Sequence, residues 1–179
     1  TIDFLQKRMP AGVKVISYTR MPRRRSALFA NKKPVVVLIP KKGESLGHFV
    51  CLLPRKRSIE YFSSLGGSPT SELALLNEAK DKMMDILGTN YTYNKVQLQS
   101  RSYKVQDCAS WCLARVIMSH LKLREFLTLF RQKTMMRTPD DVVSLMTVLN
   151  MVNKKDKLCS PRAFPNKKGY MINKKEKLF

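Results

Sequence analysis

Residues 35–53, with the sequence VVVLIPKKGESLGHFVCLL, contain two apolar runs on either side of a polar turn. The first run, 35–39, is a continuous and largely β-branched series, which is typical of a strand buried on both faces of a sheet. After the polar turn at 41–45, a second strand is predicted at 48–53, with His48 at its head. This unit predicts a sheet at the centre of the molecule.

The rest of the chain places strands and helices around this unit. We expect further strands at 13–18, 58–62 and 91–98, a short helix at 1–9, and helices at 68–87, from 107 to about 120, at 123–133 and at 138–150. Gly88 should end the first long helix, and residues 20–33 should form a basic loop. This order predicts the α+β class, with a mixed central sheet flanked by helices.

Length and composition indicate one domain. The chain has 179 residues, of which 44% are apolar, so a sizeable core is expected and wholesale disorder is not. We predict a single domain over 1–152. Residues 153–179 are rich in lysine, and we predict a basic C-terminal tail that packs on the domain or extends from it.

The chain is strongly basic, with 34 Lys and Arg against 13 Asp and Glu and a net charge of +21. A domain this basic usually meets a polyanion, and nucleic acid is the first candidate. Two clusters should contact phosphates without reading bases: Arg23, Arg24 and Arg25, and Arg55, Lys56 and Arg57. No apolar run approaches the length of a membrane span, and we expect no membrane partner.

Four cysteines lie at 51, 108, 112 and 159. The N-terminal residues lack the pattern of a signal peptide, which argues against a disulfide framework. Two histidines and no CxxC motif argue against a zinc site. Cys51 and Cys112 fit apolar core positions, and Cys159 fits an exposed thiol in the tail.

Cys108 stands where a reactive thiol is expected. The segment QDCASWC, 106–112, places it at the start of a long apolar helix. A helix N-terminus stabilises a thiolate through its partial positive charge and its free N–H groups. A nearby imidazole can take the thiol proton, and His48 is the candidate base. Taken alone, a cysteine on an apolar helix is more often a core residue and a histidine near a turn is more often structural.

Three segments occur in one order: GHFV at 47–50, IEYFSSLG at 59–66, and DCASWC at 107–112. Together they resemble the adenovirus-type cysteine proteases (adenain) and the related SUMO-protease superfamily, over about residues 30–120. Members of these families have His, an acid, Gln and Cys in that chain order. The resemblance implies an adenain-like fold, with the nucleophile at the start of a central helix.

The resemblance also implies site residues. His48 matches the base and Cys108 the nucleophile, while Ser63 falls where the family has its acid. Serine can orient an imidazole by a hydrogen bond but has no charge. Glu60 is the nearest carboxylate, although it should lie on the opposite face of the strand from Ser63. The third member is therefore Ser63, Glu60 or absent.

The family's oxyanion glutamine lies a few residues before its cysteine. Gln99 is our prediction for this role, with Gln97 and Gln106 as alternatives. Ala109 stands where the family has a glycine after the nucleophile, which matters only if that position needs a positive φ.

The resemblance implies a cysteine endopeptidase that cleaves viral structural precursor proteins during virion maturation. It would work as a monomer in the virion and in the infected cell, in the nucleus or a cytoplasmic virus factory. The chemistry needs no cofactor, and DNA is expected as an activator. Two alternatives remain: a deconjugating protease for a ubiquitin-like protein, and a catalytically silent basic DNA-binding protein of the virion.

Overall fold

The computed structural model describes residues 1–41, 47–100, 107–131 and 138–158. Its described strands form one five-stranded sheet in the order β1-β2-β3-β4-β5. The strands are β1 Lys14–Ser17, β2 Val35–Pro40, β3 Gly47–Pro54, β4 Ile59–Phe62 and β5 Tyr91–Tyr93. β1 and β2 are parallel, as are β4 and β5, whereas β3 is antiparallel to both of its neighbours. The predicted mixed sheet and α+β class are confirmed.

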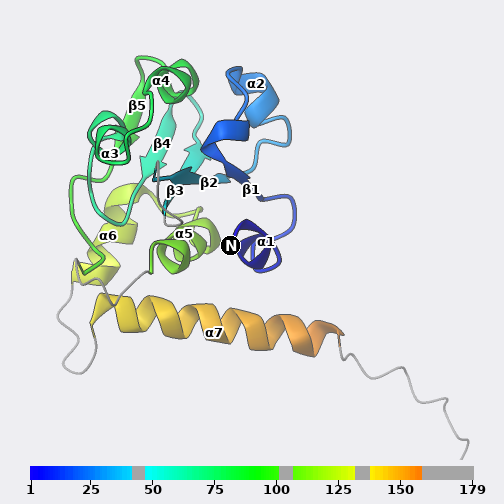
Figure 1. Cartoon of the computed structure of the whole chain (residues 1–179). Coiled ribbons are helices and arrows are strands. Elements are labelled where there is room, and N and C mark those ends of the chain that lie inside the picture. The colour runs from blue at the N-terminus through cyan, green and yellow to red at the C-terminus, as the bar shows by residue number, and fades with distance from the viewer. Residues whose placement is uncertain (42–46, 101–106, 132–137, 159–179) are drawn as a thin grey trace, which may run out of the picture.

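Helices cover both faces of the sheet (Figure 1). They are α1 Ile2–Gln6, α2 Arg25–Leu28, α3 Pro69–Leu75, α4 Asp81–Leu87, α5 Cys108–Ile117, α6 Leu123–Arg131 and α7 Pro139–Leu158, with a 3-10 turn at Tyr18–Arg20. Figure 1 shows α2, α3 and α4 on one face and α5 on the other, with α7 running beneath α5. None of the helices described is both long and apolar enough to span a bilayer.

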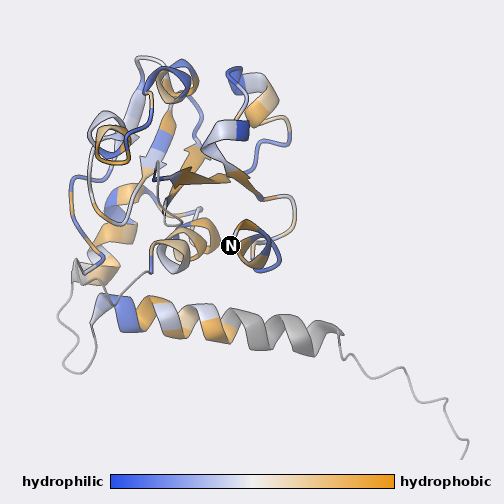
Figure 2. Cartoon of the chain, viewed as in Figure 1, coloured by the Kyte–Doolittle hydropathy of each residue, from blue (hydrophilic) through white to orange (hydrophobic). Residues whose placement is uncertain are grey.

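The sheet separates two apolar cores. Val36 and Trp111 belong to the core on the α5 side. Val35, Val37 and Leu73 belong to the core on the α3 and α4 side. β2 is therefore buried on both faces, as its β-branched run predicts, and the strands at the centre of the sheet are strongly hydrophobic in Figure 2.

The prediction of one helix over 68–87 is wrong, because the chain forms α3 and α4 with a break between them. Asn77 lies in this break with φ of 61°, a left-handed conformation that asparagine tolerates better than most residues. The apolar periodicity hid the break because both helices bury side chains in the same core, for example Leu73 and Ile86. Gly88 follows α4 with φ of 64°, so the predicted helix end is confirmed.

Other boundaries also differ from expectation. β5 ends at Tyr93 instead of continuing to 98, because the Asn94 side chain turns back and donates to the carbonyls of Ser63 and Val96. The predicted basic loop at 20–33 contains the short helix α2. α5 ends at Ile117, before His120.

The C-terminal helix is longer than predicted. α7 continues through Leu158, past the expected end at about 150, so the helix enters the segment predicted as a tail. Cys159 and the remainder of that segment lie outside the described residues.

Candidate active site

His48 lies near the start of β3, with 6% of its surface exposed. Its Nε2 atom is 2.9 Å from the hydroxyl of Ser63, so the structure brings these two predicted site residues together. Burial lowers the pKa of His48 to about 4, because the charged ring loses its hydration. The ring is therefore neutral at pH 7 and can accept a proton.

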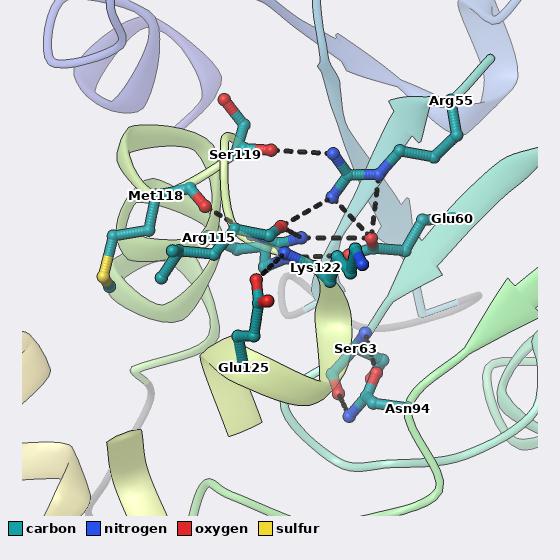
Figure 3. Close-up of polar contacts among 10 residues, drawn as sticks. Arg55, Glu60, Ser63, Asn94, Arg115, Met118, Ser119, Lys122 and Glu125 are labelled. Carbon is teal, nitrogen blue, oxygen red and sulfur yellow. Dashed lines mark hydrogen bonds and ion pairs between the residues drawn. The ribbon is translucent and has the colours of Figure 1, made fainter. Parts of the chain in front are cut away.

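Ser63 follows the last residue of β4 and is fully buried. Its hydroxyl donates to Oε1 of Glu72 at 2.5 Å and accepts from the backbone N–H of Leu65 at 3.2 Å. The Asn94 side chain binds both the N–H and the carbonyl of Ser63, as Figure 3 shows. Asn94, the residue that follows β5, thus fixes the backbone of Ser63 by hydrogen bonds.

Glu72 is a buried carboxylate that the sequence analysis missed. It lies in the first turn of α3, and its Oε2 atom is 3.8 Å from Nε2 of His48. Besides Ser63, it accepts from the hydroxyl of Tyr61 at 2.6 Å and from the N–H of Gly67 at 3.0 Å. Burial raises the pKa of Glu72, and the three hydrogen bonds oppose this effect.

A local signal for Glu72 is present in the sequence. A Cβ atom at Gly67 would lie 2.7 Å from the Glu72 carboxylate, so only glycine leaves room for that side chain. Gly67, five residues before Glu72, is therefore a position in the sequence that the packing of this carboxylate requires to be glycine.

Cys108 is the first residue of α5, with 8% of its surface exposed. The backbone N–H groups of Phe49, Ala109 and Cys108 itself favour its thiolate, but burial outweighs them and raises the pKa of the thiol. Burial thus opposes the stabilisation of the thiolate that the helix start was expected to provide.

α5 packs against β3, the strand that carries His48 and Phe49 near its start. In the part of the chain that is described, no hydrogen bond joins the His48 ring to the Cys108 sulfur. Such contacts are often long in a free enzyme and tighten when substrate binds.

Gln99 is buried near the same turn. Its side-chain oxygen accepts from the hydroxyl of Ser64 at 2.7 Å, and its N–H donates to the Ser64 carbonyl at 3.1 Å. Gln97 donates to the carbonyl of Gln99 at 2.9 Å and so supports its backbone. Gln106 lies outside the described residues.

Glu60 belongs to a different cluster, at the other end of β4 (Figure 3). Arg115 donates to its two oxygens at 2.7 and 3.0 Å, and Arg55 donates to Oε2 at 3.0 and 2.6 Å. Both oxygens are thus bound by guanidinium groups. The structure does not bring Glu60 to His48.

No family model matches the chain. An uncharacterized protein of the Sputnik virophage is 29% identical over 126 residues, which covers 63% of this chain and 72% of that protein. The match supports a viral origin.

The basic clusters are only partly free of internal contacts. Arg23 pairs with Asp85 at 2.9 Å, and Arg25 donates to the carbonyls of Ile86 and Leu87 at the end of α4. Five of the six residues predicted to contact phosphates are exposed at the surface, namely Arg23, Arg24, Arg25, Lys56 and Arg57, whereas Arg55 is half-buried.

A pocket of about 490 Å³ lies at the Glu60 end of β4, and Arg55, Lys122 and Arg124 are among its lining residues. Neither His48 nor Cys108 lines it. Among the residues described, no group of three metal-ligating side chains occurs.

Proposed function

We propose that this chain is a viral cysteine endopeptidase with Cys108 as the nucleophile and His48 as its base. The observation that supports this most directly is the position of Cys108 as the first residue of α5, a helix that packs against β3, the strand that carries His48 near its start. The imidazole and the thiol are both buried, on two elements that pack against each other.

The arrangement favours general-base chemistry over a resting ion pair, because the thiol and the ring are both neutral at pH 7. Ser63 occupies Nε2 of the ring, which leaves Nδ1 to take the Cys108 proton. The thiolate then attacks the peptide carbonyl carbon, and the ring returns the proton to the leaving amine as the C–N bond breaks. Water hydrolyses the resulting thioester with the same base.

The start of α5 suits the oxyanion of this reaction. Backbone N–H groups in the first turn of a helix have no partner within the helix, and those of Cys108 and Ala109 favour the thiolate. They can donate to the oxygen that becomes negative as sulfur attacks. Gln99 would add its amide, held in place by Ser64.

The substrates we propose are structural precursor proteins of a virus, cleaved during particle maturation. The virophage relative and the resemblance to adenain-type proteases both favour this class. The protein would act in the virion and the infected cell. A ubiquitin-like conjugate is the alternative substrate for the same chemistry.

The decisive experiment combines thiol labelling with cleavage assays. Iodoacetamide should label Cys108 at neutral pH, and His48→Ala should slow this labelling about a hundredfold. Cys51 and Cys112 are fully buried and serve as internal controls in the mass spectrum. Labelling that is equally fast in His48→Ala would overturn the proposal and favour the silent DNA-binding protein.

Cleavage then separates the substrates. Capsid precursors of the source virus should be cut by the unmodified chain and not by Cys108→Ala. Cutting confined to a ubiquitin-like fusion would identify the deconjugating alternative instead.

We also propose that DNA activates the enzyme through sequence-independent phosphate contacts. The net charge of +21 and the exposed Arg24, Lys56 and Arg57 support this. Affinity should fall steeply with salt and should not depend on base sequence. Fluorescence anisotropy with two unrelated duplexes, at 50 and 200 mM salt, measures both properties. Binding that is insensitive to salt would contradict the proposal.

A further inference from the structure

Ser63 stands where an acid is expected, yet a carboxylate lies directly behind it. The Ser63 hydroxyl links Nε2 of His48 at 2.9 Å to Oε1 of Glu72 at 2.5 Å. All three side chains are buried, with exposures of 6%, 0% and 3% for His48, Ser63 and Glu72. The three groups form one hydrogen-bonded chain that is shielded from water.

The proton inventory sets the direction of this chain. A serine hydroxyl has one proton to donate and two lone pairs. Ser63 gives its proton to Glu72 and accepts from the N–H of Leu65, which leaves one lone pair for His48. Nε2 of His48 must therefore be the donor, and Nδ1 must be the nitrogen without a proton. This is the tautomer in which Nδ1 can take a proton from the Cys108 thiol.

The direction depends on Glu72 being an acceptor. An ionised carboxylate accepts only, and this one receives donors from Ser63, Tyr61 and Gly67. A protonated carboxyl would have to donate to one of these groups, and the donor and acceptor at each hydrogen bond between Glu72, Ser63 and His48 would no longer be fixed. The negative charge of Glu72 also lies 3.8 Å from Nε2, close enough to stabilise the ring once it becomes positive.

We propose that Glu72 is the acid of this site and acts on His48 through the hydroxyl of Ser63. This inference rests on the proposed peptidase function. Glu72 is a positioning residue, because it touches neither the thiol nor the substrate. During attack the proton moves from the Cys108 sulfur to Nδ1 and later to the leaving amine, while Glu72 keeps its charge throughout.

The alternative is that Glu72 has a structural role alone and anchors α3 to the sheet. Four variants separate the two readings: Glu72→Gln, Ser63→Ala, Tyr61→Phe and the double variant Ser63→Asp with Glu72→Gln. Glu72→Gln keeps the shape but can donate as well as accept, so the tautomer is no longer enforced. Tyr61→Phe removes an anchoring bond and keeps the charge.

The readout is the rate at which iodoacetamide labels Cys108, where a sulfur–carbon bond forms, iodide leaves and His48 takes the proton. Glu72→Gln and Ser63→Ala should each slow labelling about tenfold or more at pH 7, in line with loss of part of a general-base effect. The labelling rate of Tyr61→Phe should remain well above the rates of Glu72→Gln and Ser63→Ala. The double variant puts a carboxylate directly beside the ring and should recover most of the rate. If the labelling rates of the four variants fall in the same order as their melting temperatures, the proposal is overturned.

A second readout does not depend on catalysis. Nitrogen-15 NMR of the His48 ring should show the Nε2–H tautomer in the unmodified chain and a mixture in Ser63→Ala. An Nδ1–H tautomer in the unmodified chain would refute the relay. Labelling that depends on His48 but is unchanged in Glu72→Gln would also refute it while leaving the peptidase intact. If labelling of the unmodified chain does not depend on His48, the peptidase proposal fails, and the tautomer still decides the relay.

Discussion

Glu60→Gln tests whether the second buried carboxylate serves stability and not chemistry. Arg115 is fully buried, and its guanidinium donates to both Glu60 oxygens and to the carbonyls of Met118 and Leu121. Arg55, with 29% of its side chain exposed, shares the same carboxylate. Replacing Glu60 with glutamine leaves two guanidinium groups facing each other without a counter-charge.

The expected loss is large. Breaking a buried ion pair by removing one partner costs about 3–5 kcal/mol. With a urea dependence of about 2 kcal/mol per molar for a chain of this size, the unfolding midpoint should fall by about 2 M. Trp111 is the one tryptophan of the chain and is fully buried, so its fluorescence reports the transition.

Asp85→Asn is the matched control. Asp85 pairs with Arg23 at 2.9 Å, but their side chains are 49% and 64% exposed. Such pairs contribute about 0–1 kcal/mol, so the midpoint should fall by less than about 0.5 M. Equal shifts in the two variants would refute the argument. In the absence of urea, Glu60→Gln that remains folded should label Cys108 at the normal rate, and a tenfold loss would restore Glu60 as a candidate for the site.

Three further predictions concern His48, Cys108 and Gly67. The folded state keeps His48 neutral, so the contribution of His48 to the free energy of unfolding should be complete above pH 6.5 and should fall by up to about 3 kcal/mol as the pH drops toward 4. The raised pKa of Glu72 has the opposite effect and offsets part of this loss. Urea unfolding of His48→Gln and Glu72→Gln at each pH separates the two contributions. In His48→Ala, Cys108 labelling should still rise beyond pH 9, since burial raises the thiol pKa, and a plateau at neutral pH would contradict this. Gly67→Ala forces the Glu72 carboxylate away from a Cβ at 2.7 Å, so it should slow labelling as Glu72→Gln does, whereas an unchanged rate would count against the relay.

The central strands of the sheet could be predicted because residues close together in the sequence determine where they begin and end. The β-branched run at 35–39 and the polar turn after it fix β2 and β3 and their antiparallel pairing. β5 could not be predicted at its correct length, because its end depends on Asn94 bonding to Ser63, 31 residues away in sequence. The alternation of apolar and polar residues along a strand does not reveal that a side chain such as that of Asn94 bonds to the backbone of a distant residue.

The helix prediction failed for a related reason. α3 and α4 bury their apolar side chains in one core, so the periodicity runs through the break at Asn77. Hydrophobic pattern reports which face is buried and not whether the backbone is continuous. The same limit applies to the thiol: the sequence places Cys108 at a helix start, but its burial by the rest of the fold decides the direction of its pKa shift.

The candidate site shows where a resemblance has to be completed by three-dimensional contacts. A resemblance aligns positions, and at position 63 it finds a serine where an acid is expected. A carboxyl group is present nonetheless, nine residues later on another element, and that serine donates a hydrogen bond to it. A hydroxyl held between a carboxylate and an imidazole, with its other lone pair occupied by Leu65, transmits orientation in one sense only. An alignment that scored position 63 alone would report a missing acid, whereas under our proposal Glu72 is the acid and lies one group further from the ring.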